Sequence, residues 1–184
     1  MRRLTTVAAC AVALGIAAPA VAQTQQQNAA SPDAMTVDLK ALTKDGTGET
    51  IGSVTILPGD GGTSFQVQAT GLKEGEHGFH VHQNGSCEPQ DGTPGGAAGG
   101  HWDPDTAGTH RGPEGAGHLG DLPFLTADAQ GTVDDTVTAP RIDDASRLRG
   151  HALIIHEGGD TYSDEPKLGG GGARVACGVI PQAS

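Results

Sequence analysis

Short segments in which apolar and polar residues alternate, with no segment of helical period, restrict this chain to an all-β fold. Residues 64–69, for example, place Phe65, Val67 and Ala69 on one side and polar side chains on the other. A period of two is that of a half-buried strand, whereas an amphipathic helix needs a period of 3.6. The strands predicted in this way are residues 36–43, 50–57, 64–69, 78–83, 123–127, 132–138, 152–155 and 174–180. About eight short strands predict an antiparallel sandwich or flattened barrel.

Two long irregular stretches interrupt the strands and are expected to carry the function. Residues 84–122 are rich in glycine and lack periodicity, and residues 157–172 form a second such stretch. Loops of this length are uncommon in a compact domain unless they are functional or disordered. Because most of the histidines lie in or beside these stretches, we interpret both as functional loops.

The first 22 residues have the pattern of a secretory signal peptide. Arg2 and Arg3 supply positive charge, residues 7–18 form an apolar run too short to span a bilayer, and residues 20–22 (Ala-Val-Ala) form a small-residue cleavage site. A lipoprotein signal at Cys10 is the alternative, although little apolar sequence precedes it. We therefore expect cleavage at this site and an exported protein, periplasmic or otherwise extracytoplasmic.

The remainder is expected to consist of a short arm and one domain. Residues 23–35 are polar and predicted to form a disordered arm, and residues 36–184 form the domain. The full chain carries a formal charge of −11, and loss of the two arginines of the signal would make it −13. Such a charge argues against nucleic acid and anionic membranes as partners, so no membrane contact is expected after signal cleavage. It is compatible with a small anionic substrate if positive charge is focused locally.

Two cysteines, Cys87 and Cys177, remain after signal cleavage and suggest one disulfide. Exported proteins meet an oxidising compartment in which such a pair normally oxidises. In the chain-entropy model, closing a loop of about 90 residues stabilises the fold by about 4–5 kcal/mol. Two buried free thiols are the alternative.

His80 and His82 lie two residues apart in a predicted strand, so their imidazoles project from the same face within reach of one ion. His156, which ends a short apolar run, is a third candidate ligand. A set of imidazoles alone suits copper, zinc or nickel. His77 points away from the pair, and His151 has an odd offset from His156. We interpret His77 as structural and His151 as a bystander.

The first long loop contains a second candidate set: His101, His110, His118 and Asp121. Three imidazoles and one carboxylate form a tetrahedral set suited to zinc, and a glycine-rich loop can wrap around an ion. Because protein would fill all four positions, the set is typical of a structural site rather than a catalytic one. A solvated loop with unrelated histidines is the alternative.

These candidate ligands stand in motifs that resemble one known family. The motifs are Gly78-Phe79-His80-Val81-His82, Gly99-Gly100-His101-Trp102-Asp103-Pro104, Gly117-His118-Leu119-Gly120-Asp121-Leu122-Pro123, His156-Glu157-Gly158-Gly159-Asp160, and the run from Gly169 through Arg174 and Cys177 to Ile180. In this order and spacing, over roughly residues 36–181, the chain resembles copper–zinc superoxide dismutase of the exported bacterial type.

The resemblance implies a fold, two cofactors and a ligand set. The fold would be an eight-stranded Greek-key flattened barrel or sandwich, immunoglobulin-like, with two long functional loops. One copper and one zinc ion would be bound per subunit, in a monomer or a homodimer. The copper ligands would be His80, His82, His101 and His156, and the zinc ligands His101, His110, His118 and Asp121. His101 would therefore bridge the two ions, and Cys87 and Cys177 would be the disulfide pair.

The implied reaction is disproportionation of superoxide to O₂ and H₂O₂. Copper would cycle between Cu(II) and Cu(I), while zinc keeps its oxidation state. Arg174 would be the active-site arginine that gives a small anion a local positive focus, and His101 would be ligand and proton donor. One alternative is a copper-binding or copper-buffering protein on the same fold without significant turnover. Another is a β-sandwich module that captures metals incidentally. Arg174 and the bridging set favour the enzyme, because storage needs neither.

Overall fold

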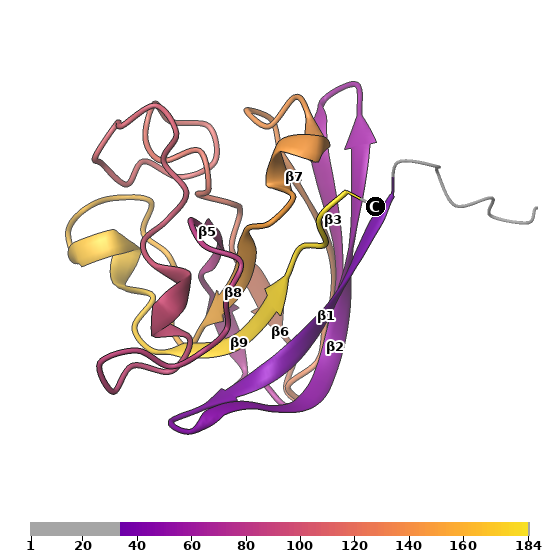
Figure 1. Ribbon diagram of the computed structural model, residues 1–184, viewed down its shortest axis with the longest axis vertical. Helices are drawn as coiled ribbons and strands as arrows, with labels where there is room; N and C mark the ends of the chain where they lie inside the picture. The colour runs from indigo at the N-terminus through magenta and orange to yellow at the C-terminus, as the bar shows by residue number, and fades with distance from the viewer. Residues whose placement is uncertain (1–33, 184) are drawn as a thin grey trace, which may run out of the picture.

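The computed structural model describes residues 34–183, which form nine β-strands and three short 3-10 helices (Figure 1). The strands are β1 (Met35–Thr43), β2 (Gly46–Gly59), β3 (Gly62–Ala69), β4 (Gly75–His77), β5 (Phe79–His82), β6 (Leu125–Ala127), β7 (Val133–Ala139), β8 (Ala152–His156) and β9 (Arg174–Val179). The 3-10 helices are η1 (Gly96–Ala98), η2 (Ala145–Leu148) and η3 (Lys167–Gly170). None of these described helices is long and apolar enough to cross a membrane.

Seven strands form one curled antiparallel sheet in the order β5-β8-β9-β1-β2-β3-β7, and β4 and β6 form a second, two-stranded sheet (Figure 1). β4 leads directly into β5, and β6 is followed by β7, so the small sheet connects the two edge strands of the large one. Sequence neighbours β7 and β8 lie far apart in the strand order. The prediction of an all-β fold of the Greek-key type is confirmed.

All eight predicted strands are present, and the structure adds a ninth. β4 is not predicted because Gly75-Glu76-His77 has no β-branched or aromatic residue, and it forms by pairing with β6. β1 begins at Met35, one residue before the predicted domain start, because Met35 is buried and pairs with Ile56. The predicted signal peptide and residues 23–33 of the predicted arm lie outside the described residues.

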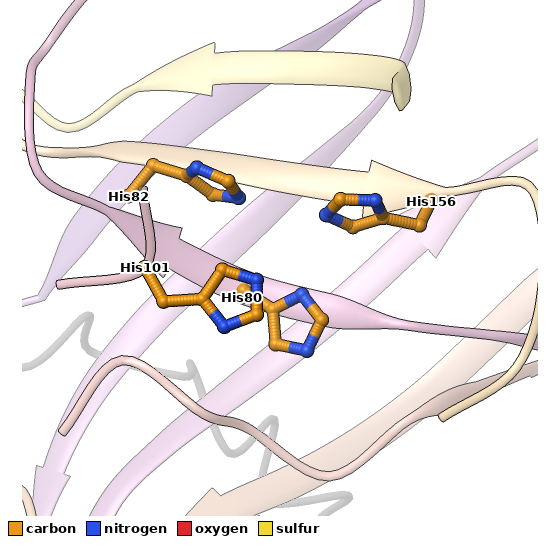
Figure 2. A group of neighbouring side chains, drawn as sticks. All are labelled: His80, His82, His101 and His156. Carbon is orange, nitrogen blue, oxygen red and sulfur yellow. The ribbon is translucent and has the colours of Figure 1, made fainter. Parts of the chain in front are cut away.

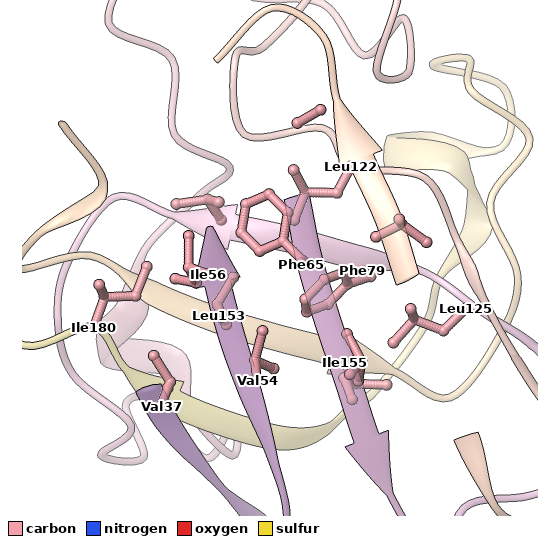
Figure 3. Close-up of a cluster of buried hydrophobic side chains, with 14 of the residues drawn as sticks. Val37, Val54, Ile56, Phe65, Phe79, Leu122, Leu125, Leu153, Ile155 and Ile180 are labelled. Atoms are coloured by element: carbon pink, nitrogen blue, oxygen red, sulfur yellow. The ribbon is translucent and has the colours of Figure 1, made fainter. Parts of the chain in front are cut away.

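The core lies inside the curl of the large sheet and is built from alternate residues of its strands (Figure 3). Val54 and Ile56 of β2 and Phe65 of β3 are fully buried, which at about 25 cal/mol per Å² gives about 1.5–3 kcal/mol for each large side chain. Phe65 packs edge-on against Phe79 of β5, with ring centroids 5.9 Å apart. β5 is therefore anchored to the core by one of its faces.

Candidate metal centre

β5 and β8 supply three of the four histidines of the first cluster. The two strands pair antiparallel. Phe79 and Val81 of β5 belong to the core, so His80 and His82 project from the opposite face, as their spacing predicts. Both strands are buried along their full lengths, because the long loops cover this outer face. The histidines are thus held by regular strands and covered by the irregular long loops.

An irregularity at the end of β8 brings His156 opposite Arg174 of β9. The two strands pair in regular register from Ala152 to Ile155, after which the register shifts by one residue. Such a shift re-aims a side chain locally. The backbone N–H of His156 also donates to the carbonyl of Gly78, 2.8 Å away, which fixes the histidine to the start of β5.

The first long loop lies with its backbone along the free edge of β5. The N–H and C=O of Val81 both bond to loop backbone, at 2.9 and 2.8 Å. Isolated bridges pair His80 with Asp121 and His82 with His101. The loop residues His101 and Asp121 are therefore placed beside the strand histidines by the same hydrogen bonding that joins strands in a sheet.

The first cluster consists of His80, His82, His101 and His156, whose ligand atoms all lie within 4.8 Å of one another (Figure 2). His80 Nδ1, His82 Nε2 and His156 Nε2 are buried and have no hydrogen-bond partner. A buried polar atom without a partner costs free energy. Several such nitrogens in one cluster are typical of a metal site, because their lone pairs point toward the position of an ion.

The other ring nitrogens of these histidines are held by protein oxygens. His82 Nδ1 lies 2.9 Å from the carbonyl oxygen of Gly99, and His156 Nδ1 lies 3.3 Å from that of Gly172. A ring N–H that donates to a carbonyl leaves the lone pair on the opposite nitrogen. These contacts therefore fix both the ring orientation and the tautomer that presents Nε2 to an ion.

The second cluster surrounds the carboxylate of Asp121. Its Oδ1 lies 2.9 Å from His101 Nδ1 and 3.4 Å from His118 Nδ1, and its Oδ2 lies 2.9 Å from His110 Nδ1. The Nδ1 atoms of His110 and His118 are buried without hydrogen-bond geometry to any partner. Ligands at about 2.0–2.1 Å from a tetrahedral zinc ion lie about 3.3 Å from one another. The spacing of these atoms fits one small ion.

The group of close ligand atoms in this region differs in one member from the predicted zinc set. It contains His80, His101, His110 and Asp121, all within 4.8 Å of one another, and not His118. His80 enters because its ring stacks on that of His101, with centroids 3.9 Å apart. His118 lies at the margin of the group and is the most loosely held of the predicted ligands.

Asp160, in the second long loop, links the two clusters and was not among the predicted site residues. Its Oδ2 lies 2.8 Å from His80 Nε2, and its Oδ1 lies 2.7 Å from His110 Nε2. Gly169 leaves room for this contact, because a Cβ there would collide with the Asp160 carboxylate and crowd His110. No spacing rule identifies a carboxylate that touches ligands rather than the ion, so only the fold shows this residue.

Burial keeps the histidines of the first cluster neutral. It lowers the pKa of His156 to about 3 and that of His101 to about 4, with neighbouring imidazoles adding to the shift. Burial also lowers the pKa of His80 and, more strongly, that of His82. The neutral imidazole is the form that ligates a metal, so this cluster is ready to bind at neutral pH.

The carboxylates of the second cluster have the opposite effect. Burial alone would lower the pKa of His110, but Asp121 and Asp160 outweigh it and raise the pKa to about 9. Burial alone would raise the pKa of both carboxyl groups, but hydrogen bonds from histidines hold each well below its usual range. This half of the site thus carries negative charge that attracts a cation.

Arg174 lines a cavity of about 310 Å³ that opens onto His82, His101 and His156. Its half-buried guanidinium donates to the carbonyls of Gly95 and Gly99 in the first loop. Lys167 lines the same cavity. Two cations on a small cavity beside neutral imidazoles form a local positive focus on an acidic protein.

Cys87 and Cys177 form the predicted disulfide, with Cα atoms 5.7 Å apart and a sequence separation of 90. The bond joins the start of the first long loop to β9, three residues from Arg174. A larger groove of about 800 Å³ lies over the disulfide. It has no histidine in its lining, so the chemistry belongs to the smaller cavity.

The remaining histidines have structural contacts. Both ring nitrogens of His77 lie 2.7 Å from backbone carbonyl oxygens, one of them that of His156. His151 Nδ1 lies 2.7 Å from the carbonyl of Gln83, and its ring packs against Trp102, with centroids 4.8 Å apart. Neither residue belongs to the metal-ligand groups of the described chain. Trp102 is itself buried and packs the first loop against the core.

Comparison with known proteins identifies one family. Residues 50–180 match the family model described as copper/zinc superoxide dismutase (SODC). The chain is 51% identical over 149 residues to the superoxide dismutase [Cu-Zn] of Escherichia coli K12, which covers 78% of this chain and 86% of that protein.

Solved structures agree in sequence and in shape. The Cu/Zn superoxide dismutase from Brucella abortus is 48% identical, with a TM-score of 0.78 over 80% of this chain and 99% of that one. The monomeric copper, zinc superoxide dismutase from Salmonella enterica is 49% identical, with a TM-score of 0.72 and the same coverage of both chains.

Proposed function

This chain belongs to the copper/zinc superoxide dismutase family, and we propose how its two clusters divide that family's chemistry. The protein is an oxidoreductase that converts two superoxide anions and two protons into O₂ and H₂O₂, and its cofactors are copper and zinc. The roles of individual residues are our assignment.

We assign one copper and one zinc ion per subunit to the two clusters. Copper is held by His80, His82, His101 and His156, and zinc by His101, His110, His118 and Asp121. The single observation that carries this assignment is a set of five buried ring nitrogens without partners: His80 Nδ1, His82 Nε2, His110 Nδ1, His118 Nδ1 and His156 Nε2. Within the described residues no other buried side-chain polar atom lacks a partner, and every one of the five belongs to the assigned set.

When bound, copper supplies the one-electron redox chemistry and zinc supplies a fixed positive charge. The chain's own part begins with Arg174, whose guanidinium attracts and orients the anion in the cavity. Hydrogen bonds to the carbonyls of Gly95 and Gly99 hold the guanidinium in place.

His101 is the residue that can hold and release a proton. Its Nδ1 lies 2.9 Å from Asp121 Oδ1, on the side of the ring assigned to zinc, so Nε2 is the nitrogen that would take up a proton and pass it to the product. A ring held at one nitrogen would keep its position while the other nitrogen takes up and releases the proton. His110, Asp121 and Asp160 serve this step only by keeping the ring in position.

The experiment that tests this function is superoxide decay after pulse radiolysis, with the domain loaded with copper and zinc and the metal-free protein as control. We expect fast, copper-dependent decay. Stoichiometric metal binding without turnover would instead support the copper-buffer alternative, which no observation here favours.

The location and the assembly of the protein are further proposals. The predicted signal peptide supports export to the periplasm, and the monomeric relative from Salmonella enterica supports a monomer. Mass spectrometry of the protein recovered from a periplasmic extract should find Gln23 as the first residue. Sedimentation velocity should give a single species of monomer mass, and a twofold larger mass would indicate the homodimer.

A further inference from the structure

One cation outside the cavity contacts the backbone of the zinc-binding loop. Arg141 follows β7 and is half-buried. Its Nη1 donates to the carbonyl of His118 at 3.2 Å and its Nη2 to the carbonyl of Gly117 at 3.1 Å. Both guanidinium nitrogens therefore bond to consecutive peptide groups, one of which belongs to a predicted zinc ligand. A planar fork of this kind restrains the direction of the backbone it holds.

The base of Arg141 is fixed to the body of the domain. The next residue, Ile142, is fully buried in the core, and its N–H donates to the carbonyl of Ala139 at 3.2 Å. The carbonyl of Ile142 accepts from the buried hydroxyl of Thr63 in β3 at 2.7 Å. Arg141 is therefore a connection between the rigid barrel and the tip of a loop.

The guanidinium has no other partner that would explain its position. Among the described residues, no carboxylate forms an ion pair with Arg141. The carbonyl of Gly117 accepts no backbone hydrogen bond within the described chain, and that of His118 accepts only a long one from Asp121, at 3.4 Å. Both carbonyls thus depend on Arg141 for a good hydrogen bond.

His118 is the predicted zinc ligand that most needs such support. Its Nδ1 is 3.4 Å from Asp121 Oδ1, against 2.9 Å for the nitrogens of His101 and His110. Its side chain is also the most exposed of the three. Its backbone is otherwise tied only within the loop, to Thr109 and Asp121.

We propose that Arg141 is a positioning residue for zinc: its two hydrogen bonds hold the Gly117–His118 backbone so that the His118 imidazole stays in the zinc site. This inference rests on the zinc assignment proposed above. It predicts that loss of the fork weakens zinc binding and leaves the strand-borne copper ligands unaffected, because the guanidinium bonds to the backbone of Gly117 and His118 and to none of those ligands.

The test is competition of a zinc chelator with Arg141→Ala, Arg141→Lys and Arg149→Ala. Arg149 is a matched control because it lies in the same connection and donates to one backbone carbonyl, that of Pro181, away from the loop. For Arg141→Ala we expect zinc affinity to fall about tenfold, as is typical for partners that orient a ligand. Copper affinity should stay within twofold, and Arg149→Ala should bind both metals like the wild type.

Two readouts separate positioning from general destabilisation. The melting temperature of the metal-free protein should be nearly the same for both alanine variants. The visible spectrum of Co²⁺ in the zinc site should change only in the Arg141 variants, since it reports ligand geometry. Arg141→Lys keeps the charge but not the fork, so its zinc affinity should remain several-fold below the wild type. If Arg141→Ala does not fold, Arg141→Lys alone still tests the inference.

Several results would overturn the inference. Zinc affinity within twofold of the wild type in Arg141→Ala would do so, as would full recovery in Arg141→Lys or an equal loss of copper and zinc. If the wild-type protein itself bound no zinc or Co²⁺ at this loop, the zinc assignment would fail instead, and the two failures are therefore distinguishable.

Discussion

The two halves of the metal centre share His101 but are built in different ways. In our assignment, the copper half takes its other ligands from β5 and β8, which are regular, fully buried and joined to the core. The zinc half would take its ligands from one glycine-rich loop, whose three histidines surround the carboxylate of Asp121. The strands therefore hold their histidines through the sheet, whereas the loop holds its side chains through contacts with one another and with Asp160.

The difference between the two halves in metal affinity should be largest when the carboxylate of Asp121 is removed. In Asp121→Ala the zinc ligands lose their shared oxygen contacts, and we expect zinc affinity to fall more than 100-fold, beyond the loss typical of partners outside the ligand set. Copper affinity should fall far less, because His80, His82 and His156 stay on their strands. Competition titration of each metal measures both, and zinc affinity near the wild-type value would remove Asp121 from the ligand set.

Removing the charge beside the cavity should change the rate without changing either half. Arg174→Ala is expected to keep both metals and to lose at least tenfold in superoxide decay rate, together with most of its salt dependence, because local steering fields contribute about 10–1000-fold. Arg174→Lys keeps the charge and should lose less. Pulse radiolysis at several salt concentrations measures both variants, and unchanged kinetics in Arg174→Ala would exclude the steering role.

Removing the carboxylate that joins the halves should produce a smaller, shared effect. Asp160→Asn keeps the size of the side chain but offers an N–H₂ group where one histidine now meets an oxygen. We expect about a tenfold loss of zinc affinity, with a smaller loss for copper through His80. Glu157→Gln, on the exposed surface of the same loop, is the control. An effect on copper alone would contradict a linking role.

The pH dependence of the metal-free protein should show the two halves separately. His156 and His101 have pKa values of about 3 and about 4 in the fold, against about 6.5 when unfolded. Below pH 6.5 the unfolded chain therefore binds more protons, and the free energy of unfolding should fall, by up to about 1.4 kcal/mol per pH unit for each group.

His110 acts in the opposite direction. Its pKa of about 9 in the fold gives stability that is complete below pH 6.5 and is lost as the pH rises through 9. Urea unfolding with a chelator present, at pH 5, 6.5 and 9, should show the highest stability at the middle value. A curve that rises steadily from pH 5 to 9 would mean that the loop carboxylates do not hold a proton on His110.

The sequence predicts the strand-borne half better than the loop-borne half, for a physical reason. A period of two fixes which face His80 and His82 share, and the structure places both as expected. The role of Asp160 depends on a contact between the two long loops. That of Arg141 depends on a contact between the β7–β8 connection and the first long loop. No local pattern encodes such contacts. The periodicity of the sequence likewise does not predict the register shift at His156, because that shift depends on pairing with β9.

The docking of the first loop on β5 has a consequence for the behaviour of the chain in solution. β5 is the last strand of the large sheet, and its outer N–H and C=O groups are occupied by loop backbone. An exposed strand edge is a template on which another chain can pair. The loop that carries the assigned zinc ligands therefore also covers a strand edge that could otherwise pair with another chain. Concentrated metal-free protein should consequently self-associate more readily than the loaded form.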